Sequence, residues 1–159
     1  MENLREKIYE AIFEEDQGLK QEKLKALLVK LNEEGYVGSS IYPLYKKFSE
    51  SFLGFTVPAF NLRVLTYDLA RTILRVAKRL RVGAVIFEIA RSEMGYTKQS
   101  PLEYAVCVLS AARDEGYPGP VFLQGDHFQA NRKAYFANPD AEKRILTNLI
   151  EQAISAVNS

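Results

Sequence analysis

Residues that cross-link chains or bind metal ions are scarce in this sequence: of its 159 residues, one is a cysteine and one is a histidine. The lone cysteine, Cys107, excludes an intramolecular disulfide and any metal cluster built from several thiolates. It lies within an apolar helical stretch, which favours buried packing over chemical reactivity. This cysteine usage is typical of a reducing compartment, so we expect a cytoplasmic protein.

Long apolar runs and an excess of charge are missing as well. No stretch approaches the ~20 apolar residues of a membrane span, and the charged segment from Glu2 to Lys7 is unlike a signal peptide, so no membrane partner is expected. The net charge of +1 argues against a dedicated nucleic-acid-binding protein. The most basic stretch, residues 71–81, alternates with apolar residues and predicts the solvated face of a helix rather than a phosphate-binding patch.

The first part of the chain, residues 1–54, shows helical periodicity. Its apolar positions fall on one helix face before and after a break placed at Gly18, and Gly35 is the predicted end of the second helix. A third short helical segment carries the aromatic residues Tyr45, Phe48 and Phe52. We predict that this N-terminal extension is a helical cap on the rest of the molecule.

The second part, residues 55–159, alternates strand and helix three times. The predicted strands are 57–61, 84–89 and 120–125, and the predicted helices are 66–81, 100–115 and one that begins at Pro139. Residues 90–99 are predicted to be a polar loop, and a loop of this length in a compact domain is often functional.

Consecutive βα units with short connections predict an α/β fold with parallel strands and right-handed crossovers. Two architectures fit, a small doubly wound sheet and part of a (β/α)8 TIM barrel. No glycine-rich phosphate loop follows the first strand, and this argues against a doubly wound sheet that binds a dinucleotide. A complete barrel needs roughly 250 residues. We therefore expect residues 55–159 to form the first three βα units of a partial TIM barrel.

The third strand stops at Gly125 and is followed directly by an acid and the one histidine, Asp126 and His127. In α/β folds, ligand-binding and catalytic groups gather at the carboxyl ends of strands, where a rigid scaffold meets an open surface. The first strand ends at Asn61, and Ser92-Glu93 follows the second strand. These strand ends are the predicted functional region of the chain.

At these positions the sequence resembles the class II, zinc-dependent ketose-bisphosphate aldolases, which act on fructose or tagatose bisphosphate. The similarity lies in residues 57–61, in Ser92-Glu93 and in the segment from Val121 to His127, and it covers residues 56–157. The family cleaves a ketose bisphosphate reversibly into dihydroxyacetone phosphate and glyceraldehyde 3-phosphate. The zinc ion stabilises the enediolate that cleavage leaves.

The resemblance implies a role for each matching residue. His127 corresponds to a zinc ligand, and Asp126 to the acid that moves a proton on the C4 hydroxyl of the substrate. Asn61 is implied to lie near the bound triose, and Ser92 near a substrate phosphate. A catalytic zinc takes about three protein ligands, and this chain has one histidine, so we expect an N-terminal fragment that is inactive alone.

Plainer interpretations of the same residues stay open. Asp126 could cap a loop, Ser92 could belong to a turn, and His127 could be structural. A second function, from a different class, is a non-catalytic half-barrel or companion subunit that acts by protein–protein association. Three parallel strands would leave an open edge, so we expect a homo-oligomer or association with the missing half of a barrel.

Overall fold

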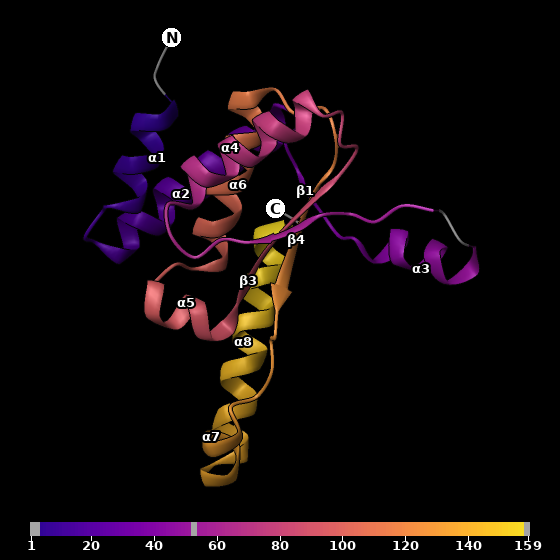
Figure 1. The fold of residues 1–159 in the computed structure, drawn as a ribbon. Helices are drawn as coiled ribbons and strands as arrows, with labels where there is room; N and C mark the ends of the chain where they lie inside the picture. Colours follow the sequence, from indigo (N-terminus) through magenta and orange to yellow (C-terminus); the bar gives the residue numbers. More distant parts are fainter. Residues whose placement is uncertain (1–3, 52–53, 158–159) are drawn as a thin grey trace.

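The computed structural model describes residues 4–51 and 54–157 and shows an α/β fold built on a four-stranded parallel sheet (Figure 1). The strand order is β1-β4-β3-β2, so the three strands expected from the sequence are neighbours in chain order. The strands are β1 (Gly38–Ser39), β2 (Ala59–Asn61), β3 (Val85–Ala90) and β4 (Val121–Asp126). The helices are α1 (Leu4–Ile12), α2 (Gln17–Glu33), α3 (Tyr42–Glu50), α4 (Thr66–Arg79), α5 (Arg91–Thr97), α6 (Pro101–Glu115), α7 (Arg132–Ala137) and α8 (Pro139–Val157).

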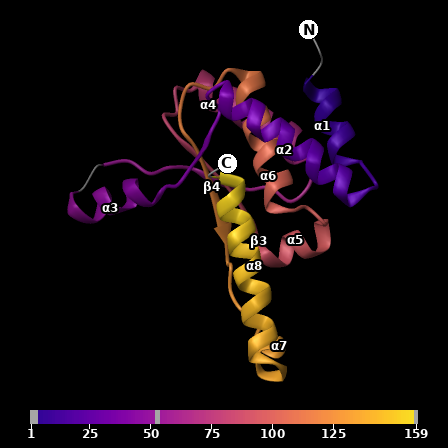
Figure 2. The same ribbon diagram turned by 180° about the vertical axis from the view of Figure 1, so that it is seen from behind.

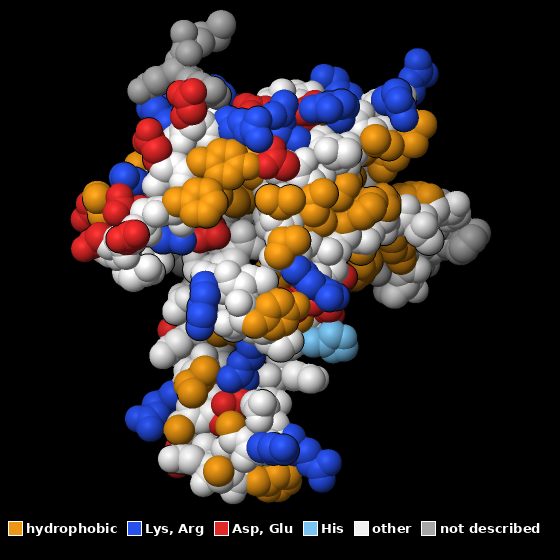
Figure 3. Space-filling view, turned by 60° about the vertical axis from the view of Figure 1, so that its left-hand side comes forward, with side chains coloured by type: hydrophobic (Ala, Val, Ile, Leu, Met, Phe, Trp, Pro, Cys, Tyr) orange, Lys and Arg blue, Asp and Glu red, His pale blue; other side chains and the backbone are white. Residues whose placement is uncertain are grey.

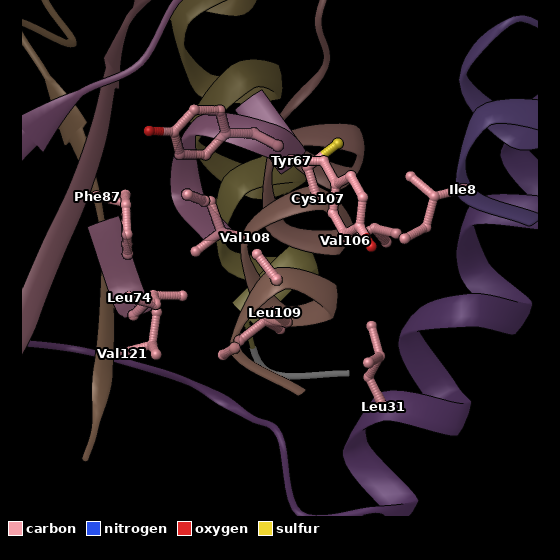
Figure 4. Close-up of a cluster of buried hydrophobic side chains, with 14 of the residues drawn as sticks. Ile8, Leu31, Tyr67, Leu74, Phe87, Val106, Cys107, Val108, Leu109 and Val121 are labelled. Carbon is pink, nitrogen blue, oxygen red and sulfur yellow. The ribbon is translucent and has the colours of Figure 1, made fainter. Parts of the chain in front are cut away.

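The main core lies between one face of the sheet and a layer of helices. Alternate residues of β3 pack with α6, a helix that is buried along most of its length; these residues are Val85, Phe87 and Ile89. Helices α1 and α2 lie against α6 and contribute Ile8 and Leu31 to the same cluster (Figure 4). Burying such apolar side chains stabilises the fold by about 1.5–3 kcal/mol each.

The opposite face of the sheet is covered less completely. A small cluster of Ile86 and Phe122 packs with Ile41, near the amino ends of the strands. Beyond it, α3 stands away from the body on the side opposite α1 and α2, and α7 with the first part of α8 projects past the end of β4 (Figures 1 and 2). Among the described helices, none combines the length and apolarity that crossing a bilayer requires.

Several helix starts follow the expected sequence signals. Ser100 accepts a hydrogen bond from the Glu103 N–H at 3.2 Å, which caps α6, and Gly116 ends that helix in the left-handed region at φ 54°. The helix that begins at Pro139 is confirmed as α8. Proline suits this first helical position because its missing N–H would have no intrahelical partner there.

Three local predictions were wrong. Residues 91–97 form helix α5 and not a loop, because the Glu93 side chain accepts the Ala90 N–H at 2.8 Å and so stabilises the first turn. The predicted break at Gly18 lies inside α2, and the chain turns before Asp16, whose carboxylate caps the helix at the Leu19 N–H. The N-terminal part is not purely helical, because β1 pairs with β4.

Helix α7 was not predicted, and the other differences are at element ends. The first predicted strand begins two residues later, at Ala59, and α4 ends at Arg79 before the predicted residue 81. Phe52, predicted to lie on the third helix, falls outside the described residues. A two-residue strand such as β1 is too short to show alternation, which is why the helical pattern of its surroundings concealed it.

Candidate functional site

A row of polar side chains crosses the sheet near the carboxyl ends of three strands. Asn61 of β2 pairs in register with Glu88 of β3, and Glu88 pairs with Gln124 of β4. Their neighbours Phe60, Phe87 and Leu123 pack into the helix-covered core. Side chains alternate along a strand, so the polar row faces away from this core. Gln124 donates its amide N–H to the Glu88 carboxylate at 2.8 Å, which fixes the middle of the row.

The acid and the imidazole follow directly beyond this row. Asp126 is the last residue of β4 and lies two positions past Gln124, on the same face of the sheet. His127 Nε2 is 3.4 Å from Asp126 Oδ1, and 72% of the imidazole side chain is exposed. The imidazole is the pale blue group in Figure 3, at the surface. The structure therefore brings the predicted catalytic acid and the predicted metal ligand together.

The backbone at His127 is held in an unusual conformation. Its φ of 48° lies in the left-handed region, where a residue with a side chain costs roughly 1–2 kcal/mol more than in the right-handed one. The Gln129 N–H donates to the His127 carbonyl at 2.8 Å and closes a tight turn. The ring of Phe128 lies over Gly125, where an added Cβ would come within 2.7 Å of ring carbons. This turn aims the imidazole outward at the end of β4.

Asn61 belongs to a second polar group, at the ends of β2 and β3. Its amide nitrogen donates to the Glu93 carboxylate at 2.8 Å, and its carbonyl accepts from Arg63 Nε at 3.1 Å. Arg63 also pairs with Glu93 at 2.6 Å. Glu93 was expected near the strand ends as part of a serine-glutamate segment, but its bond to Asn61 links positions 32 residues apart and was not predicted.

The electrostatics of Glu93 follow from these contacts. The residue is 7% exposed. Burial by itself would raise the pKa of its carboxyl, but hydrogen bonds from the Ala90 N–H and the Asn61 amide, together with the Arg63 charge, hold that pKa below its ordinary value. Glu93 is therefore ionised at neutral pH, and its charge orients both Asn61 and Arg63.

Ser92, the predicted phosphate contact, is an exposed residue in the first turn of α5. Its neighbour Arg91 forms an ion pair with the buried Glu142 of α8 and donates to the Gln129 carbonyl at 2.9 Å. Glu142 in turn accepts the Asn131 N–H at 2.6 Å. These contacts tie α5 to the loop that carries His127. The Arg91–Glu142 pair joins residues 51 positions apart, so no local sequence pattern indicates it.

A zinc ion fits only where enough side chains that can coordinate it lie close together. In residues 4–51 and 54–157 no three His, Cys, Asp or Glu side chains come close enough together to hold a metal ion. A catalytic zinc takes about three protein ligands. Cys107 is no candidate, since it is buried and burial raises the pKa of its thiol. The described residues of one chain therefore do not fit a zinc ion.

Comparison of the chain with protein-family models, with curated proteins and with solved structures returned no match.

Proposed function

We propose that the carboxyl edge of β2, β3 and β4 is a sugar-phosphate site of the class II aldolase type, within a partial TIM barrel. The substrate would be a fructose or tagatose bisphosphate, and the reaction of the complete site would be reversible aldol cleavage. The single cysteine of the chain is consistent with a cytoplasmic activity.

One observation carries the proposal: four polar residues lie at or near the carboxyl ends of three neighbouring parallel strands and alternate with residues of the main core, namely Asn61, Glu88, Gln124 and Asp126. A polar surface of this kind, on a rigid scaffold, is typical of substrate sites in α/β folds. Sugar hydroxyls need both donors and acceptors. The amides of Asn61 and Gln124 offer both, and the carboxylates of Glu88 and Asp126 are acceptors.

Asp126 is the proposed proton carrier. A carboxylate at a strand end can take the proton of a substrate hydroxyl during cleavage and return it on condensation. Asn61, fixed by Glu93 and Arg63, would bind the triose portion, and Ser92 would contact a phosphate. His127 is the proposed ligand for zinc. Since the described residues of one chain do not fit the ion, its other ligands would come from outside this chain.

Substrate binding is the direct test, since a binding measurement does not depend on a complete metal site. We expect fructose or tagatose 1,6-bisphosphate to bind in calorimetry, and Asn61→Ala to weaken that binding about tenfold by removing a hydrogen-bonding group. Thr72→Ala, on the exposed side of α4, is the matched control and should bind as the parent does. If neither bisphosphate binds to the parent protein, the proposal is contradicted.

The uncovered face of the sheet also favours a second candidate, a non-catalytic companion subunit. Parallel sheets are usually covered on both faces, whereas here the carboxyl half of one face carries the exposed imidazole and its polar neighbours. A chain that associates with itself or with another protein but binds neither sugar phosphate would support this candidate over the first.

A further inference from the structure

A cavity of about 330 Å³ lies between α1 and the body of the molecule. Its walls come from α1 and Phe13 after it, residues 63–65 and the start of α4, α5 and the segment after it, and α6. Arg63, which pairs with Glu93, lines the cavity, whereas the strand-end residues Asn61, Asp126 and His127 do not. This volume is at the lower end of the range for small-molecule sites. Sites that bind small molecules combine mostly apolar walls with a few fixed polar groups, and this cavity has both.

The polar groups form a buried chain of hydrogen bonds. Thr66 donates its hydroxyl to Gln99 Oε1 at 2.9 Å, and Gln99 Nε2 donates to Glu103 Oε1 at 3.3 Å. All three residues are at least nine-tenths buried. Lys20 pairs with Glu103 at 2.7 Å, so the carboxylate charge is balanced. The carboxylate of this hydrogen-bonded chain is therefore paired with a cation, and Thr66, Gln99 and Glu103 all line the cavity.

Gln99 retains hydrogen-bonding capacity on both of its side-chain atoms. An amide oxygen has two lone pairs and an amide nitrogen has two N–H groups. The bonds to Thr66 and Glu103 use one of each. One acceptor position and one donor N–H of the amide are therefore left over, and an amide with both can pair with a ligand that carries a donor beside an acceptor.

The rim of the cavity is unusually apolar for an exposed surface. Four of its residues, Phe13, Val64, Leu65 and Tyr96, are each more than 60% exposed although they come from three separate segments. Tyr9 also lines the cavity, with its ring stacked on that of Phe13. Figure 3 views the molecule from the α1 side and shows hydrophobic side chains gathered across the middle of this face. Such a cluster is typical of a binding site.

We propose that this cavity binds a small planar heterocycle that presents a hydrogen-bond donor next to an acceptor, as an aminopurine does. The ring lies against Phe13 and Tyr96, and its donor and acceptor pair with the Gln99 amide. Glutamine makes this bidentate contact with the N6 amino group and N7 of adenine, and aromatic side chains stack on nucleobases. A purely apolar ligand is disfavoured, because it would leave the buried amide without its second pair of bonds.

The test pair is 9-methyladenine and 9-methylpurine. The two compounds share the ring system, and the methyl group fixes the tautomer, but 9-methylpurine lacks the amino group and so has acceptors and no N–H donor. We expect 9-methyladenine to bind in a calorimetric or saturation-transfer NMR titration, and 9-methylpurine to bind about tenfold more weakly because one of the two hydrogen bonds cannot form.

The variants Phe13→Ala and Tyr96→Ala remove exposed rings and leave the buried core in place. Each is expected to weaken 9-methyladenine binding about tenfold because the base then has one ring fewer to stack on. Phe136→Ala, at an equally exposed ring on α7, is the matched control and should change nothing. The proposal would be overturned by any of three results: no 9-methyladenine binding at millimolar concentration, equal binding of the two methylated bases, or binding that the Phe13 and Tyr96 variants leave intact.

Discussion

Glu93 connects the local structure of α5 to the proposed site. Its carboxylate accepts from the Ala90 N–H and from Asn61, and it pairs with Arg63. Glu93→Gln keeps the shape but removes the charge and part of the acceptor capacity. We expect a loss of about 1–2 kcal/mol of unfolding free energy, measured by urea denaturation. Glu22→Gln, on an exposed position of α2, should be neutral within about 0.5 kcal/mol.

The same carboxylate gives a pH dependence with a definite sign. Its pKa is lower in the folded protein than its ordinary value of 4.5. A depressed pKa contributes stability that is fully present above the unfolded value and is lost as the pH falls through the folded value. The stability gap between the parent protein and Glu93→Gln should therefore be constant near neutrality and shrink below pH 4.5. A gap that widens with acidification would show that the contacts assigned to Glu93 are incorrect.

Among the glycines of the described residues, Gly119 leaves the least room for an added Cβ atom. A Cβ there would lie 2.5 Å from the Gly83 carbonyl oxygen and 2.8 Å from the Tyr117 hydroxyl. Because the nearest atom is backbone, Gly119→Ala should destabilise the protein by about 1–3 kcal/mol, seen as a lower Tm. Gly95→Ala is the control, since its Cβ meets nothing within 4 Å and it lies in α5; it should raise stability by about 0.5–1 kcal/mol.

Helices α1 and α2 are held to the body by a buried ion pair as well as by apolar packing. Lys20 pairs with Glu103 and donates to the Ile12 carbonyl at 2.8 Å. Lys20→Met leaves the Glu103 charge buried without its cation, so we expect a loss of about 3 kcal/mol of unfolding free energy. The double variant Lys20→Met/Glu103→Gln should recover part of that loss, because the uncompensated charge is gone. Equal stability of the single variant and the parent would contradict the importance of this pair.

The link between α5 and α8 should control the loop that carries His127. Arg91 holds both Glu142 and the Gln129 carbonyl. Arg91→Ala should increase amide hydrogen exchange in the segment 127–138 while leaving exchange in α6 unchanged, because the hydrogen bonds that it removes hold this segment. Arg132→Ala, at an exposed position of α7, is the control. If amide exchange in this segment is equally slow in the Arg91 variant and in the parent, other contacts hold the loop.

Elements with strong local signals could be predicted from the sequence. Strand β3 was predicted from its apolar run, and helix α6 was predicted from the serine and proline at its start. Helix α5 was missed because its polar residues resemble a loop and its start depends on the Glu93 side chain. The predicted pair Asp126 and His127 is adjacent in sequence, so its proximity follows from the chain itself. The bond between Asn61 and Glu93 depends on tertiary structure and could not be predicted locally.

At the level of the whole molecule, the sheet is unevenly covered. Its outer strands, β1 and β2, are two and three residues long, and α3 carries exposed aromatic residues such as Tyr45 with Phe55 beyond its end. Open strand edges and exposed apolar side chains favour association. We expect sedimentation equilibrium to show a homo-oligomer at micromolar concentration. A monomer across the whole concentration range would rule this out.

The proposed sugar-phosphate site at the carboxyl edge of β2, β3 and β4 can be located residue by residue in solution. We would titrate the ¹⁵N-labelled protein with fructose 1,6-bisphosphate and with tagatose 1,6-bisphosphate and follow its ¹H–¹⁵N NMR spectrum. We expect the amide signals of Asn61, Ser92 and His127 to shift with at least one sugar, while that of Gly119, which precedes the amino end of β4, does not. Unchanged signals at the strand ends with both sugars, or shifts confined to another surface, would mean that this edge is not a sugar-phosphate site.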